Sequence, residues 1–94
     1  MVGAIQNWDL HLEGCHSLKD KRAILQSLKA GLRKQLNVAV AEVEHQDLWQ
    51  RATLGVVTVA TDGAHAEREL QAVADELERA EPGLITRTVV EHLA

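Results

Sequence analysis

The sequence contains very little of several residue types, and each shortage excludes a class of protein. Its 94 residues include one cysteine, one proline and two tryptophans, with no phenylalanine or tyrosine. The single cysteine, Cys15, cannot form an internal disulfide, which is typical of proteins in a reducing compartment. No apolar run approaches the roughly 18 residues needed to span a membrane, and the N-terminus lacks the pattern of a secretory signal. We therefore expect a cytoplasmic protein that does not associate with membranes.

The residues that are present favour one folded domain covering 1–94. Hydrophobic residues make up 46% of the chain, which is enough for one modest core. The net charge is −4, yet six of the ten lysines and arginines lie between Lys19 and Lys34. An acidic protein is unsuited to coating nucleic acid on all sides, but this segment could provide a single basic docking face.

That basic segment has the pattern of an amphipathic helix over residues 17–36. Ser17 is a suitable N-cap, and Asp20 stands three residues later to complete a capping box. An apolar stripe recurs at three- and four-residue steps, formed by Ile24, Leu25, Leu28, Leu32 and Leu36. A second stripe borders it and is cationic, formed by Lys19, Arg22, Lys29 and Arg33. We call these four residues the basic flank.

The remaining chain predicts four strands and a second helix. Apolar residues alternate or run together over 2–12, 37–45, 53–61 and 84–92, as strands require, and Asp62 caps a helix that reaches about Ala80. The order is β-α-β-β-α-β. Because both crossovers should be right-handed, both helices pack on one face of the sheet. The predicted fold is a ferredoxin-like α+β sandwich, with four antiparallel strands and two helices.

The second and third strands are apolar on both faces, although helices can cover only one. The uncovered face then carries either Ala39, Ala41 and Val43 or Val38 and Val40. Monomers rarely leave such a patch in solvent, so we expect a homodimer formed through the open sheet face.

Several local features are also predicted. The alternation of the first strand breaks at Ile5 and Gln6, which indicates a bulge or a two-faced environment there. Asn37 is a plausible left-handed stop after the first helix, and Gly83 favours the turn after the second. In the segment 46–52, Asp47 and Arg51 are spaced for a pair on one helical turn.

Catalytic and metal-binding residues are not predicted, and neither is a cofactor. Cys15 precedes a helix N-terminus and adjoins His16, but no third group is available to orient a nucleophile–base pair. His11, Cys15 and His16 lack the number and spacing of a metal site. An RNA-recognition motif would need aromatic residues on two strands, and the third strand has none.

Trp49 is singular in another way, because the sequence leaves two roles open for it. It could close the edge of the sheet as a packing residue, or it could anchor an interface, where tryptophan is enriched.

Several short blocks in this chain resemble the YlxP-like family, a bacterial domain of unknown function and about this length. They are Ser17-Leu18-Lys19, Lys21-Arg22, Leu32-Arg33, Asn37-Val38, Val40-Ala41-Glu42 and Asp47-Leu48-Trp49-Gln50-Arg51. The resemblance implies a ferredoxin-like fold and a cytoplasmic bacterial protein. In some bacteria, relatives of this family are encoded beside translation-initiation and ribosome-maturation genes. No activity follows from it, so Glu42, Asp47, Trp49, Gln50 and Arg51 are motif or interface positions without assigned roles.

Two functions of different classes are consistent with these observations. The first is a non-enzymatic binding module whose basic flank docks on structured or ribosomal RNA, since cations at helical spacing can follow phosphates without reading bases. The second is a dimeric regulatory or scaffolding domain that holds a small molecule or protein partner near residues 46–51. An unrecognised enzyme is a third possibility.

Overall fold

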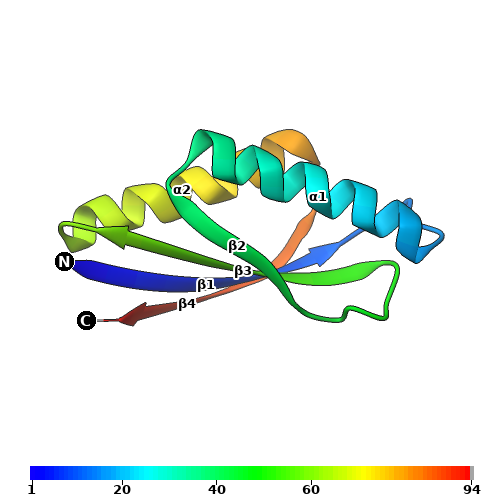
Figure 1. The fold of residues 1–94 in the computed structure, drawn as a ribbon, viewed down its shortest axis with the longest axis horizontal. Helices are drawn as coiled ribbons and strands as arrows, with labels where there is room; N and C mark the ends of the chain where they lie inside the picture. The colour runs from blue at the N-terminus through cyan, green and yellow to red at the C-terminus, as the bar shows by residue number, and fades with distance from the viewer. Residues whose placement is uncertain (94) are drawn as a thin grey trace.

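The protein is a two-layer α+β sandwich in which one face of a four-stranded sheet is covered by two helices (Figure 1). The structure, a computed structural model, describes the backbone of residues 1–93 and the side chains of residues 1–89. The elements in chain order are β1 (Val2–His11), α1 (Leu18–Gln35), β2 (Val38–Glu44), β3 (Arg51–Ala60), α2 (Gly63–Ala80) and β4 (Ile85–Leu93). Neighbouring strands are antiparallel in the order β2-β3-β1-β4. The predicted ferredoxin-like fold is confirmed.

Both helices begin at the residues that the sequence predicts. The Ser17 hydroxyl accepts a hydrogen bond from the backbone N–H of Asp20, and the Asp62 carboxylate accepts one from His65. These caps satisfy N–H groups that have no partner within the helix. The capping box is shifted by one residue, because the Asp20 carboxylate accepts from His16 instead of Ser17.

The core lies between the helices and the sheet. Leu32 of α1 and Leu77 of α2 have no exposed surface, and Leu28 is 6% exposed. The burial of Leu28 and Leu32 confirms the apolar stripe predicted for α1. The sheet contributes alternate residues of β1 and β3 to the same core, among them Trp8, Leu10, Ala52, Leu54 and Val56.

The opposite face of the sheet has no covering layer in the described chain. Val40 is buried under the helices, whereas Ala39, Ala41 and Val43 are exposed on the other side. The structure therefore decides which of the two predicted sets is uncovered. Because side chains alternate along a strand, the uncovered side of β3 carries Val57 and Val59. We call this side of the sheet the open face.

Three local predictions are wrong. The register shifts occur between Asp9 and Leu10 and between Glu42 and Glu44, not at Ile5 and Gln6. Gln6 keeps the alternation and faces the core, because its side-chain oxygen accepts a hydrogen bond from the Trp8 indole at 3.0 Å.

The helix stop also differs from the prediction. α1 ends through Leu36 in an extended conformation, and the positive φ angles belong to His45 and Gly83 and not to Asn37. Gly83 does form the predicted turn after α2, with a φ of 80°. A left-handed residue is unnecessary after α1 because the Leu36 N–H still bonds to the Leu32 carbonyl.

Candidate interaction surface on the first helix and the β2–β3 loop

The basic flank lies along the side of α1 that overhangs the free edge of β2. Lys19 and Arg22 are exposed, and Lys29 is half-buried. Arg33 is exposed but engaged, because its Nη2 donates a 2.8 Å hydrogen bond to the Val40 carbonyl. β2 is an edge strand, so this bond occupies a backbone acceptor that would otherwise face solvent. The structure thus brings the four predicted residues onto one side of α1, but Arg33 is already hydrogen-bonded to the edge strand.

The other three cations have no acidic partner. Among the described side chains, carboxylates lie within 4.0 Å of Lys21, His65 and Arg79 but not of Lys19, Arg22 or Lys29. Their charge is therefore uncompensated by contacts within the protein.

Lys21 behaves differently because it belongs to the apolar stripe. Its side chain is 2% exposed, and its Nζ donates a 2.6 Å hydrogen bond to the His45 carbonyl. The same Nζ lies 2.7 Å from Oε2 of Glu42 on β2. These contacts tie the first turns of α1 to the end of β2, where His45 has a φ of 63°. Glu42, one of the unassigned motif positions, therefore has a structural role.

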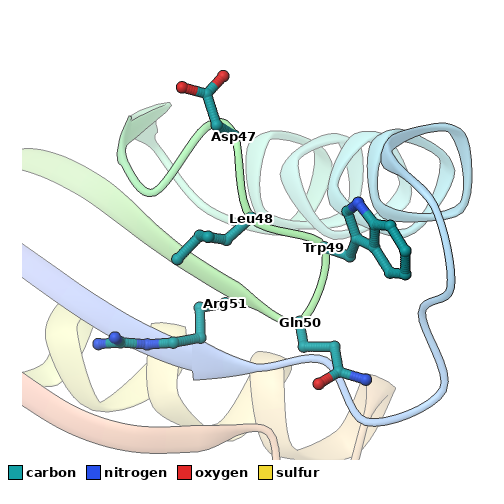
Figure 2. A pocket seen from close by; sticks show the side chains of 5 residues that line it. All are labelled: Asp47, Leu48, Trp49, Gln50 and Arg51. Atoms are coloured by element: carbon teal, nitrogen blue, oxygen red, sulfur yellow. The ribbon is translucent and has the colours of Figure 1, made fainter.

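Residues 45–50 form a loop between β2 and β3 that leaves large apolar side chains in solvent. Leu48 is 44% exposed and Trp49 is 50% exposed. With Asp47, Gln50 and Arg51 they line a shallow pocket of about 390 Å³. In Figure 2, Trp49 points to one side of the loop, whereas Leu48 and Arg51 point to the other. Trp49 is too exposed to be the packing residue considered above, and the interface role remains open for it.

The Asp47–Arg51 pairing is a wrong prediction. The loop is closed by a turn in which Leu48 N–H donates to the His45 carbonyl, and Arg51 already begins β3. Asp47 points away from Arg51 (Figure 2). Gln50 contributes through its backbone, because its carbonyl accepts a 2.8 Å hydrogen bond from the Leu12 N–H.

Cys15 is enclosed and poorly placed for reaction. Its side chain has no exposed surface. Burial raises the pKa of the thiol above its ordinary value, and the negative charges of Asp20 and Glu81 add to the rise while Lys21 opposes it. A higher pKa leaves less of the nucleophilic thiolate. Among the described side chains, those of residues 1–89, no group of three His, Cys, Asp or Glu residues is arranged to hold a metal ion. No helix of the described chain is long and apolar enough to cross a membrane.

Sequence reasoning missed the contacts of Lys21, although the sequence contained a sign of them. Lys21 falls within the leucine stripe of α1, between the positions that pack on the sheet. A lysine at such a position must reach an acceptor or leave a buried charge unpaired. The sequence could not identify His45, because the partner is 24 residues away along the chain.

The order and pairing of the strands, with two helices on one face, place the protein in the class of ferredoxin-like α+β domains. The chain belongs to the family described as "Protein of unknown function (DUF503)", which matches residues 3–90. It is 39% identical over 57 residues to the uncharacterised protein YlxP of Bacillus subtilis (strain 168). That alignment spans 61% of this chain and 62% of the relative.

Solved structures of other proteins share the fold at low sequence identity. The designed protein Foldit4 matches 99% of this chain and 96% of its own, with a TM-score of 0.59 and 13% identity. An uncharacterised NIPSNAP domain protein from Burkholderia xenovorans matches 100% and 93%, with a TM-score of 0.54 and 13% identity. SnoaB, a cofactor-independent oxygenase from Streptomyces nogalater, matches 99% and 91%, with a TM-score of 0.53 and 12% identity. These likenesses concern the fold alone.

Proposed function

We propose that this protein is a non-enzymatic binding module that docks on structured RNA, such as ribosomal RNA, through the basic flank of α1. The observation that carries the proposal is the set of uncompensated cations at Lys19, Arg22 and Lys29. An exposed cation without an internal partner is available to a phosphate, and binding releases the counterions that surround the RNA.

The geometry of the flank suits a phosphate backbone. Lys19 and Lys29 are ten positions apart on a continuous helix, so they span about 15 Å at a rise of about 1.5 Å per residue. A row of that length can contact several successive phosphates without reading the bases. The hydrogen bond from Lys21 to His45 keeps the β2–β3 loop against the first turns of this helix.

The β2–β3 loop adds an exposed aromatic side chain, Trp49, to these cations. Trp49 is 50% exposed, and it stands on the loop whose first residue, His45, is bound by Lys21 of α1. An indole can stack on an unpaired base, and stacking does not depend on the base sequence. The preferred target is therefore an RNA hairpin or junction with unpaired bases beside its phosphates.

The test is binding to purified ribosomal RNA and to a short RNA hairpin across a salt series. For three phosphate contacts, we expect the logarithm of affinity to fall against the logarithm of salt with a slope between about −2 and −3. The double variant Lys19→Glu, Arg22→Glu should lose binding while keeping the wild-type circular dichroism spectrum, since both side chains are exposed.

The matched control is Arg68→Glu, Arg79→Glu on α2, which changes the net charge by the same amount. Both of these arginines are exposed. We expect the control to bind RNA nearly as well as the wild type. If both double variants lost RNA binding equally, the loss would follow from the change in net charge and not from the position of the basic flank. Equal binding by wild type and the α1 variant, or no binding at low salt, would contradict the proposal.

A second candidate function is supported by the exposed Leu48 and Trp49, which together resemble the apolar anchors of a protein or small-molecule contact. In this alternative the protein is a regulatory or scaffolding domain, and Trp49→Ala would weaken the capture of its partner without changing the salt dependence.

A further inference from the structure

We propose that the open face of the sheet is the interface of a homodimer, in which two copies pack face to face about a twofold axis parallel to the strands and between β1 and β3. This inference concerns the side of the sheet opposite to the helices (Figure 1), and it does not depend on RNA binding.

The first observation is the apolar character of the open face. Four valines there, one or two from each of three strands, are 40 to 52% exposed: Val43, Val57, Val59 and Val89. Ala39 and Ala41 are exposed beside them. An antiparallel sheet that faces water normally carries polar side chains at these positions.

The second observation is a glycine at the centre of this face, over which neighbouring side chains lie. Gly55 lies in the middle of β3, and a Cβ atom there would stand 3.0 Å from a methyl group of Val43 and 3.5 Å from the Asn7 side-chain oxygen. Glycine thus lets neighbouring side chains lie across the strand. Small and β-branched residues at this face allow a second sheet to approach to about 10 Å, the usual separation of packed sheets.

The third observation is a division of the face into two rows that run across the strands. In the apolar row, the backbone register places Ala39 of β2, Val57 of β3 and Ile5 of β1 side by side, and Glu91 of β4 takes the fourth position at the edge of the sheet. In the polar row, Glu44, Thr53, Asp9 and Arg87 come from β2, β3, β1 and β4 respectively. Thr53 donates a 2.7 Å hydrogen bond to the Asp9 carboxylate, and the row borders a hollow of about 430 Å³.

These rows select the symmetry axis. A twofold axis across the strands would set the apolar row of one copy on the polar row of the other. An axis along the strands preserves the rows, so that each row packs on its counterpart. It also exchanges the strand positions, placing β2 on the partner's β4 and β1 on the partner's β3.

The charges of the polar row are then complementary. Arg87 of one copy stands over the Glu44 position of the second copy, and symmetry repeats this contact. Among the described side chains, no carboxylate lies within 4.0 Å of Arg87, so its charge is available for such a contact. Opposed charges at an interface fix its register.

The available area is sufficient for a stable pair. Four strands about 4.8 Å apart, in contact over about seven residues of about 3.3 Å each, project to roughly 440 Å² per copy. Once the relief of the side chains is included, the two copies bury on the order of 1,200 Å² together, at the lower end of specific interfaces.

The test is sedimentation velocity across a concentration series from about 1 to 100 µM, the range in which a small interface of this kind dissociates. We expect the wild type to be a dimer at the upper end. Val57→Asp should weaken association by about 100-fold or more, because two charges would enter an apolar row without partners. Val57 is 40% exposed in the single chain, so the monomer should keep its fold. Should that variant fail to fold, Val59→Asp provides the same test at 52% exposure.

The matched control is Ala64→Asp, which adds the same charge to the exposed first turn of α2 and should leave association unchanged. Arg87→Glu should weaken the dimer by about tenfold or more, and the exchange variant Arg87→Glu, Glu44→Arg should restore it. A wild-type monomer at 100 µM, or equal association by Val57→Asp, would overturn the proposal. Failure of the exchange variant to recover would overturn the proposed axis.

Discussion

The two helices have the same length and cover the same face of the sheet, but their charged side chains have different partners. Those of α1 reach β2 and the loop that follows it, whereas those of α2 contact residues of α2 itself. Each helix has 18 residues and buries four of them. In α2 all four are apolar, and its contacts with carboxylates join residues of the same helix: His65 lies beside Glu69, and Arg79 forms an ion pair with Glu76. In α1 one of the four is Lys21, whose contacts lie on β2 and in the loop that follows it.

The difference shows two ways of fixing a helix on a sheet. α2 packs on the sheet through its apolar stripe, and among the described side chains no hydrogen bond or ion pair joins it to a strand. α1 has the same kind of stripe and, in addition, two hydrogen bonds from cationic side chains to backbone carbonyls: Lys21 donates to His45, and Arg33 donates to Val40. Directional bonds of this kind fix the position of α1 relative to the free edge of β2, and so fix the basic flank.

The largest effect should come from the feature that the helices share. Leu32→Ala in α1 and Leu77→Ala in α2 both remove side chains without exposed surface. Each should lower the free energy of unfolding by about 2–5 kcal/mol, because the cavity is only partly refilled. Urea denaturation at one fixed protein concentration measures both. A loss below about 1 kcal/mol for either would contradict the proposed core.

A smaller effect should distinguish the helices. Lys21→Met keeps the length of the side chain but removes its charge and donors, and we expect a loss of about 1.5–3 kcal/mol from the hydrogen bond to His45 and the ion pair with Glu42. Lys19→Met, on the exposed side of the same turn, is the control and should change the unfolding free energy by less than about 0.5 kcal/mol. Equal effects in the two variants would show that the buried contacts are not used in solution.

The helix caps should give nearly equal and more modest losses. Ser17→Ala and Asp62→Ala each remove one acceptor from a first-turn N–H, at a cost of about 1 kcal/mol. Thermal and urea denaturation should agree on this value. Ser27→Ala, at an exposed position within α1, is the control that separates capping from the general preference of helices for alanine. If Ser27→Ala changed the stability as much as Ser17→Ala does, the capping hydrogen bond of Ser17 would not contribute to stability.

The smallest effect should come from the pair that α2 forms on its own surface. Arg79→Gln removes the contact with Glu76, but Arg79 is 69% exposed and solvent screens the charges. We expect no measurable change in the melting temperature at physiological salt. A clear destabilisation that disappears in high salt would mean that the surface charges of α2 contribute more than its geometry indicates.

The fold could be predicted because its signals are local. Ser17 and Asp62 have the right chemistry for caps, and the leucine spacing of α1 identifies the side that it buries. The β-α-β-β-α-β order then leaves a single common arrangement. Asn37 shows the limit of such local rules, because a residue that tolerates a left-handed conformation need not adopt one.

The surface was less predictable because it depends on contacts between distant segments. Strands apolar on both faces fit either orientation, so only the structure shows that Val40 is covered and Val43 is not. The positions of Lys19 and Arg22 follow from helical spacing, but the engagement of Arg33 with Val40 requires knowing where the edge of the sheet lies.

Cys15 can report how often its part of the folded protein opens to solvent. It is the only thiol in the sequence, and it belongs to the β1–α1 connection, where it has no exposed surface. Because burial raises its pKa, the folded protein keeps it in the unreactive protonated form. A thiol reagent can therefore label the chain only during moments when that corner opens. The labelling rate then records the frequency of those openings in the unmodified protein, without an introduced probe.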